Sequence, residues 1–208
     1  MKKTIIPILT ALLLFSGNVF ALSSSEKENN EKDVSTSWTV DKDHSSINFS
    51  VRHFFTPVTG RFNDFEADIQ FNPDNPENGK LDITIPISYI NTENTRRDNH
   101  LASEDFFNSE KWPNMRFVSS DIQKTGDNKY VAYGELTIRD VTKTVELPFE
   151  LLGVMEHPMM DETQVAGIEA GTKIKRTDFG VGVGDWAATM VVGDDVDINI
   201  NLELTATL

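Results

Sequence analysis

Histidine, serine and carboxylate side chains are the groups through which this chain could act as a hydrolase or hold a metal ion. Asp43, His44 and Ser45 are the residue types of a hydrolase triad, but adjacent residues of a strand point to opposite faces. The chain also has no Gly-x-Ser-x-Gly elbow. The four histidines are His44, His53, His100 and His157. None of them forms the HxH or HxxxH spacing of a metal site, so we predict no catalytic residue and no metal ligand.

A second polar group consists of Arg97, Asp98 and His100, in the polar segment 92–107. At the mouth of a cavity, this group could contact a head group or a metal ion. It could instead pin a helix through charge-assisted hydrogen bonds. We favour the structural interpretation, in which losing one partner would damage folding rather than ligand choice.

The same segment is rich in helix-tolerant residues and lacks β-branched runs. Thr92 or Asn94 could cap a helix at its start. A second short helix is expected over 103–107, where Glu104 and Asp105 follow Ser103 and would favour its N-terminus.

Composition excludes several classes of protein. Acidic residues number 33 and basic residues 19, which gives a formal net charge of −14. Such a charge repels phosphate backbones and argues against nucleic-acid binding. The chain has no cysteine, so disulfides and thiolate chemistry are excluded. No apolar run reaches the length of a transmembrane helix.

The first residues have the pattern of an export signal. Lys2 and Lys3 precede a short apolar run, and Val19 and Ala21 supply the small residues of a cleavage site. We expect a signal peptide over 1–21 and a flexible polar linker over 22–37. One folded domain is expected over 38–208.

Period-two alternation of apolar and polar residues dominates that domain. The clearest runs cover 46–52, 65–71, 81–88, 145–151 and 196–205. One apolar and one solvated face are typical of antiparallel sheet, and turn-forming residues over 72–79 and 125–128 separate the runs. The pattern predicts an all-β barrel or sandwich with a helical insertion. Pro86 and Pro148 should lie at an edge, an end or a bulge.

Several motifs, in order, resemble the YceI-like family. They are WTVDKDHS at 38–45, GRF at 60–62, TRRDNHL at 95–101, DFF at 105–107, WP at 112–113, FVSS at 117–120, GELTI at 134–138 and RTDFG at 176–180. The resemblance implies an extended lipocalin-like, eight-stranded antiparallel β-barrel. It also implies a bacterial periplasmic protein that holds a long polyisoprenoid, such as an isoprenoid quinone or a polyprenyl phosphate, with no further cofactor.

The apolar faces of the predicted strands supply the expected barrel lining. Alternation alone favours a solid core, because small barrels are usually filled by side chains, whereas the resemblance favours a cavity. The residues expected to line it are Phe49, Val51, Phe65, Ile69, Phe71, Ile83, Ile85, Phe117, Leu136, Phe149, Ile198 and Ile200.

Alternatives to a polyisoprenoid carrier stay open. The barrel could bind another amphiphile such as a fatty acid, serve as a stress-related module without a ligand, or modify a lipid as an enzyme. Secretion beyond the periplasm is also open, and an exposed edge strand would permit a homodimer.

Overall fold

The computed structural model describes residues 36–208, so the expected signal peptide and nearly all of the expected linker lie outside the described residues. The strands are β1 (Ser37–His53), β2 (Thr56–Phe62), β3 (Glu66–Gln70), β4 (Lys80–Pro86), β5 (Ile90–Asn91), β6 (Asn114–Gly126), β7 (Lys129–Ile138), β8 (Val141–Glu156), β9 (Thr163–Lys175) and β10 (Val192–Thr207). The helices are α1 (Thr95–Ala102) and the 3₁₀ turns η1 (Pro76–Asn78), η2 (Ile87–Tyr89), η3 (Arg176–Phe179) and η4 (Gly184–Ala187). None of the described helices is long and apolar enough to cross a membrane.

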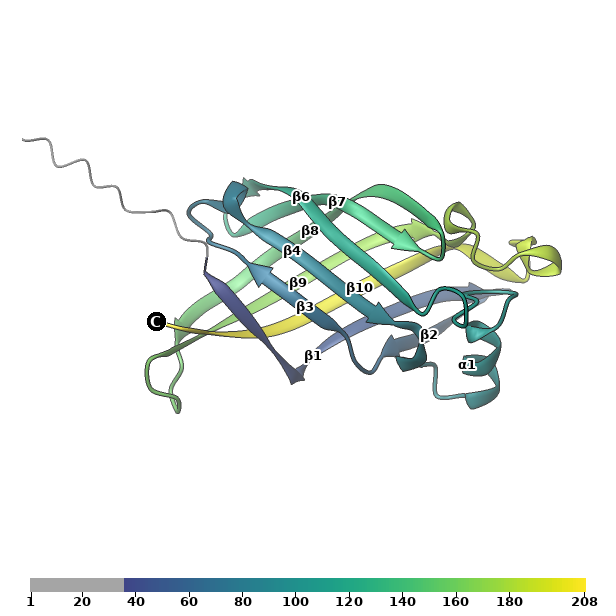
Figure 1. Cartoon of the computed structure of the whole chain (residues 1–208), viewed down its shortest axis with the longest axis horizontal. Coiled ribbons are helices and arrows are strands. Elements are labelled where there is room, and N and C mark those ends of the chain that lie inside the picture. Colours follow the sequence, from purple (N-terminus) through teal and green to yellow (C-terminus); the bar gives the residue numbers. More distant parts are fainter. Residues whose placement is uncertain (1–35) are drawn as a thin grey trace, which may run out of the picture. The chain divides into compact units, whose positions relative to one another are not determined.

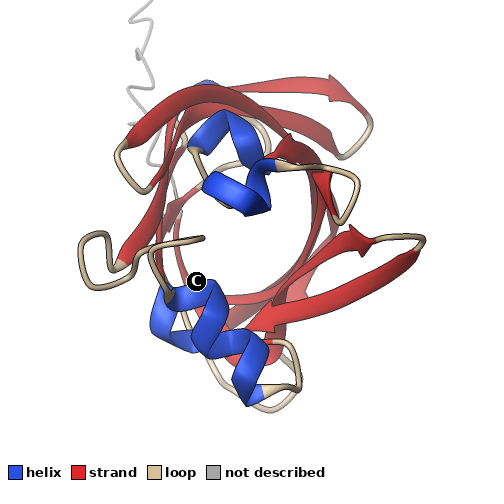
Figure 2. Cartoon of the chain, turned by 90° about the vertical axis from the view of Figure 1, so that its right-hand side faces the viewer, coloured by secondary structure: helices blue, strands red, loops and turns tan. Residues whose placement is uncertain are grey.

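The strands close into an eight-stranded antiparallel barrel, as predicted. The order β10-β9-β8-β7-β6-β4-β3-β1 is closed by pairing of β1 with β10. The short strand β2 pairs with β1 beside this ring (Figure 1), and β5 pairs with β2. Figure 2 looks along the barrel and shows the strands surrounding its interior.

Strand β1 changes partners part-way along its length. Its start pairs with β3 through Trp38 and Ile69, and its later part pairs with β2 from Ile47 onward. A bulge between Asp41 and Ser46 interrupts the β1–β10 ladder at this change, and β1 bends sharply (Figure 1). Bulges bend the strand that contains them, so this irregularity lets one strand serve both neighbours.

The predicted alternation places apolar side chains inside the barrel, and the two prolines lie where the ladder permits them. Pro86 is the last residue of β4. Pro148 lies within β8 and pairs with Val131 of β7, but the ladder to β9 begins only at Phe149. Pro148 is therefore the last residue of a part of β8 that has no ladder partner in β9.

Helix α1 begins after Asn94, whose side chain accepts a hydrogen bond of 3.1 Å from the backbone N–H of Arg97. The expected second helix over 103–107 is wrong, because these residues form turns. The Ser103 hydroxyl donates to the carbonyl of His100, and the backbone of Ser103 is extended, which ends α1. The turns that follow bury Phe106.

Candidate ligand cavity

A cavity of about 190 Å³ occupies the half of the barrel next to α1. Inward side chains of the strands form its walls, and Leu101, Phe106 and Phe107 line it beside α1. Although Arg116, Thr172 and Arg176 border the cavity, no polar atom contributes to its surface. Such a dry, mostly aliphatic and aromatic chamber suits an apolar ligand.

All twelve predicted lining residues border an internal cavity. The larger cavity is lined by Phe49, Val51, Ile85, Phe117, Leu136 and Ile198. A smaller one, of about 60 Å³, is lined by Phe65, Ile69, Phe71 and Phe149. Ile83 and Ile200 border both cavities. Contact of these residues with a ligand remains a prediction.

Close packing brings Phe49 against β2. Its ring lies 5.5 Å from the ring of Phe62, measured between centroids, and a Cβ at Gly60 would collide with it. Glycine at position 60 therefore makes room for Phe49 in the cavity wall.

The end of the barrel opposite α1 is filled by aromatic rings. Phe71 packs edge-on against Tyr130 and Phe149, at centroid distances of 5.1 and 5.4 Å. The rings of Tyr130 and Phe149 stack on each other at a centroid distance of 5.2 Å. The Trp38 indole donates a 3.0 Å hydrogen bond to the carbonyl of Phe71. Burial raises the pKa of the Tyr130 hydroxyl. We call Trp38, Phe71, Tyr130 and Phe149 the aromatic plug, which closes this end of the barrel next to the smaller cavity.

Two segments, 100–107 and 176–192, cover the other end, and we call them the cap. The rings of His100 and Trp186 meet at 4.8 Å between centroids. The backbone N–H of Val183 donates to the carbonyl of Asp105 at 2.8 Å. The two segments therefore hold each other over the cavity.

Buried Arg176 organises the second segment of the cap. Its guanidinium donates to five backbone carbonyls, those of Val181, Gly182, Trp186, Val192 and Gly193. Burial lowers the pKa of Arg176, and the five acceptors offset part of the desolvation cost. Gly182 has a positive φ of 79°, and a Cβ there would collide with the guanidinium.

Sequence reasoning did not identify the cap residues that line the cavity. Leu101, Phe106, Phe107 and Val181 lie in helix or loop, outside any alternating strand. The adjacent aromatic pair Phe106-Phe107 in an otherwise polar segment was the available signal, since phenylalanine is among the residues most often buried.

The polar group of Arg97, Asp98 and His100 divides in the structure. The carboxylate of Asp98 accepts hydrogen bonds from the backbone and hydroxyl of buried Thr92, at 2.9 and 2.5 Å. Arg97 donates to the hydroxyl and carbonyl of Thr92, at 2.7 and 2.5 Å. His100 instead contacts Asp105 at 3.0 Å. Two of the three residues thus pin α1 to the chain before it.

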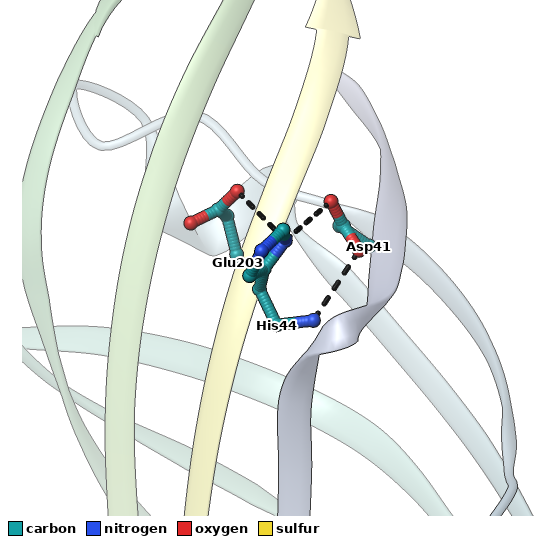
Figure 3. Close-up of side chains that lie close together, drawn as sticks. All are labelled: Asp41, His44 and Glu203. Atoms are coloured by element: carbon teal, nitrogen blue, oxygen red, sulfur yellow. Dashed lines mark hydrogen bonds and ion pairs between the residues drawn. The ribbon is translucent and has the colours of Figure 1, made fainter.

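A histidine between two carboxylates lies on the β1 bulge (Figure 3). The Nδ1 atom of His44 is 2.9 Å from Asp41 Oδ2 and 3.6 Å from Glu203 Oε1. The hydrogen bond to Asp41 raises the pKa of His44, and the same bond lowers the pKa of Asp41. Asp41 also accepts hydrogen bonds from the backbone N–H groups of Asp43 and His44.

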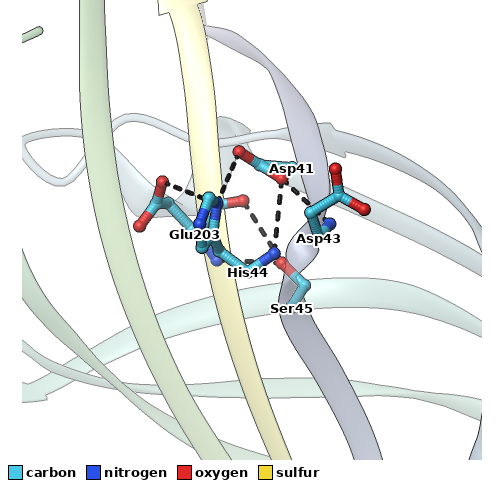
Figure 4. Close-up of polar contacts among 5 residues, drawn as sticks. All are labelled: Asp41, Asp43, His44, Ser45 and Glu203. Carbon is cyan, nitrogen blue, oxygen red and sulfur yellow. Dashed lines mark hydrogen bonds and ion pairs between the residues drawn. The ribbon is translucent and has the colours of Figure 1, made fainter.

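Ser45 completes the bulge without forming a triad (Figure 4). Its hydroxyl accepts a 3.0 Å hydrogen bond from the Glu203 N–H and donates to the Glu203 carbonyl at 3.4 Å. The ligand atoms of Asp41, His44 and Glu203 lie within 4.8 Å of one another, a spacing compatible with a metal ion. Histidine spacing could not reveal this group, because Glu203 comes from β10. The ion pairs of His44 with Asp41 and Glu203 account for this arrangement without a metal ion, because they hold the bulge of β1 against β10.

The fold and the cavity define a class: a closed antiparallel barrel with a dry internal chamber, the architecture of proteins that enclose a small apolar ligand. The YceI-like domain model matches residues 38–204, and the chain belongs to this family.

Relatives span nearly the whole chain. The UPF0312 protein plu2095 of Photorhabdus laumondii is 36% identical over 180 residues, which is 86% of each chain. Protein YceI of Escherichia coli O6:H1 is 32% identical over 206 residues, covering 98% of this chain and 97% of the relative.

Solved structures share the barrel. Burkholderia cenocepacia BcnA is similar with a TM-score of 0.71 and 30% identity, over 81% of this chain and all of that one. The Campylobacter jejuni YCEI protein has a TM-score of 0.67 and 36% identity, over 82% of this chain and 98% of that one. A polyisoprenoid binding domain from Saccharophagus degradans shares the fold, with a TM-score of 0.61 at 12% identity, over 82% of this chain and 99% of that one.

Proposed function

We propose that this protein binds a long-chain polyisoprenoid, an isoprenoid quinone or a polyprenyl phosphate, inside its barrel. The observation that carries the proposal is the larger cavity, whose surface is wholly apolar. Burial of apolar area contributes roughly 25 cal/mol per Å², so a long prenyl chain can be held tightly without polar contacts. The polyisoprenoid binding domain of S. degradans, which has the same fold, supports this choice of ligand.

The proposed role is storage or transport in the periplasm, without catalysis. The export pattern of residues 1–21 supports the location. The apolar cavity surface supports binding without chemistry, because an enzyme would need a polar or titratable group beside its substrate.

Native mass spectrometry of gently purified protein tests the proposal. A mass above that of the denatured chain, with a polyprenyl compound or quinone recovered by solvent extraction, is the expected result. Recovery of a fatty acid would replace the proposed ligand with that amphiphile. A ligand-free mass that stays unchanged after incubation with ubiquinone-8 and undecaprenyl phosphate would contradict the proposal.

Two neighbouring tryptophan substitutions sharpen this test. Leu136→Trp should fill the larger cavity and abolish the added mass, because Leu136 lines it. Glu135→Trp is the matched control, since Glu135 is the preceding, exposed residue on the outer face of β7. Loss of the ligand in both variants would mean that the effect does not arise in the cavity.

A further inference from the structure

The barrel wall contains an incomplete seam between β8 and β9. Ladder pairing between these strands runs from Glu156 and Gln164 to Phe149 and Ala170. Both strands continue beyond that point, yet within residues 36–208 no ladder pair joins 141–148 to 171–175. Residues 141–148 stay paired with β7, and residues 171–175 stay paired with β10. We call the stretch between 141–148 and 171–175 the open seam.

Pro148 explains where the ladder ends. Backbone polar groups of alternate residues in a strand point to the same side. The carbonyl of Glu146 points toward β9, because it accepts a 3.1 Å hydrogen bond from the hydroxyl of Thr172. The backbone donor of residue 148 would point the same way, and proline has none. A side-chain hydroxyl thus substitutes for a backbone bond along the open seam.

The larger cavity lies directly behind the open seam. Val145 and Leu147 line it from the β8 margin, and Thr172 and Ile174 line it from the β9 margin. The continued register would place these residues opposite one another, Leu147 against Thr172 and Val145 against Ile174. Separation of the two margins would therefore open the apolar chamber to the outside.

Both ends of the barrel offer more resistance. The aromatic plug fills one end, and its members are all nearly inaccessible to solvent. The cap covers the other end, where Arg176 alone makes five hydrogen bonds to carbonyls. Opening the cap would break this buried network. The hydrogen bond of the Thr172 hydroxyl crosses the open seam, and just beyond it an exposed ion pair joins Lys143 of β8 to Asp178 of the cap.

We propose that a long apolar ligand enters and leaves the barrel sideways, through the open seam between β8 and β9. This inference rests on the proposed function, since it concerns the route of the same ligand. A linear prenyl chain suits a slit, because it can pass one isoprene unit after another while β8 stays paired with β7 and β9 stays paired with β10.

A reversible covalent bridge across the open seam tests the route. The seam variant, Glu146→Cys with Lys173→Cys, places thiols at exposed positions that the continued register sets opposite each other. The chain has no cysteine of its own. The matched control variant is Glu150→Cys with Glu169→Cys, an exposed pair within the formed ladder, four residues further along each strand.

The readout is the rate at which each protein takes up ubiquinone-8 from phosphatidylcholine vesicles, followed by native mass spectrometry. The oxidised seam variant should load at least about tenfold more slowly than the same protein after reduction, with equal final loading. The oxidised control variant should load at the rate of its reduced form. If the thiols do not pair on oxidation, a short bismaleimide linker can close the same pair.

Equal loading rates with the open seam bridged and unbridged would overturn the sideways route. Failure of the unmodified protein to load at equilibrium, with ubiquinone-8 or with undecaprenyl phosphate, would instead contradict the proposed function. Pro148→Thr gives an independent check, because it restores the missing backbone donor. It should slow loading and increase protection of the Lys173 region from amide exchange; such protection with an unchanged loading rate would also overturn the route.

Discussion

The imidazole of His44 lies 2.9 Å from the carboxylate of Asp41, on the bulge where β1 changes its partner strand. Asp41 and His44 both lie at the bulge of β1, and Glu203 of β10 approaches the same imidazole from the neighbouring strand of the barrel wall. The pairing therefore joins local bulge geometry to the closure of the barrel.

Stability should depend on pH through this pair. The folded-state pKa of His44 is raised above its ordinary value of 6.5, so its contribution is full below that value and is lost as the pH rises through the folded pKa. His44→Gln should therefore destabilise the protein more at about pH 5.5 than at about pH 8.5. Urea unfolding at both pH values measures the difference.

Asp41 makes stability depend on pH in the opposite direction. Its pKa is lowered below the ordinary value of 3.8, so its contribution is present above that value and is lost as the pH falls through the folded pKa. In an Asp41→Asn background, His44→Gln should have little further effect at the lower of the two pH values. An equal effect of His44→Gln in both backgrounds would mean that Asp41 is not the partner that matters.

Truncation of the aromatic plug should reduce stability. Phe149 is 7% exposed and contacts both Phe71 and Tyr130, so Phe149→Ala should cost about 3–5 kcal/mol. Glu150→Ala, at the next and exposed position, is the control and should stay within about 0.5 kcal/mol of the parent. Denaturant unfolding gives both values, and a cost below about 1 kcal/mol for Phe149→Ala would show that the plug is not tightly packed.

Arg176 should be required for an ordered cap. Arg176→Lys keeps the charge but loses the fork of donors that reaches five carbonyls, and we expect a loss of about 3 kcal/mol. Amide exchange should accelerate across residues 181–193, where those carbonyls lie. Unchanged exchange in this segment would contradict the role given to Arg176.

The contacts of Asp98 predict a folding defect rather than altered ligand choice. Asp98→Ala leaves the N–H and hydroxyl of buried Thr92 without their acceptor, at a cost of about 2 kcal/mol. Ligand competition by native mass spectrometry should give the same preference between ubiquinone-8 and undecaprenyl phosphate as the parent protein. A changed preference would instead support contact of this group with a lipid head group.

The sequence predicted the walls of the barrel better than its ends. Strands such as β10 alternate so regularly that Ile198 and Ile200 could be assigned to the interior from their spacing alone. Phe106 and Val181 reach the same cavity from irregular segments. In such segments no repeating pattern tells from the sequence which side chains point inward.

Long-range pairing limited the prediction in two other places. His44 meets Glu203 only because β1 and β10 close the barrel, a contact that local spacing does not encode. The edge-like position expected for Pro148 did indicate a local interruption. Its meaning became clear only when the partner strand β9 and the cavity behind it were known.

The aromatic plug has a consequence for the lengths of molecules that the barrel can accept. The two cavities share Ile47, Ile83, Leu147 and Ile200 as a common partition, and the plug lies beyond the smaller one. Rotation of these side chains would join the chambers into one blind tube. The distance from the cap to the plug would then act as a molecular ruler, grading linear ligands by their number of repeating units.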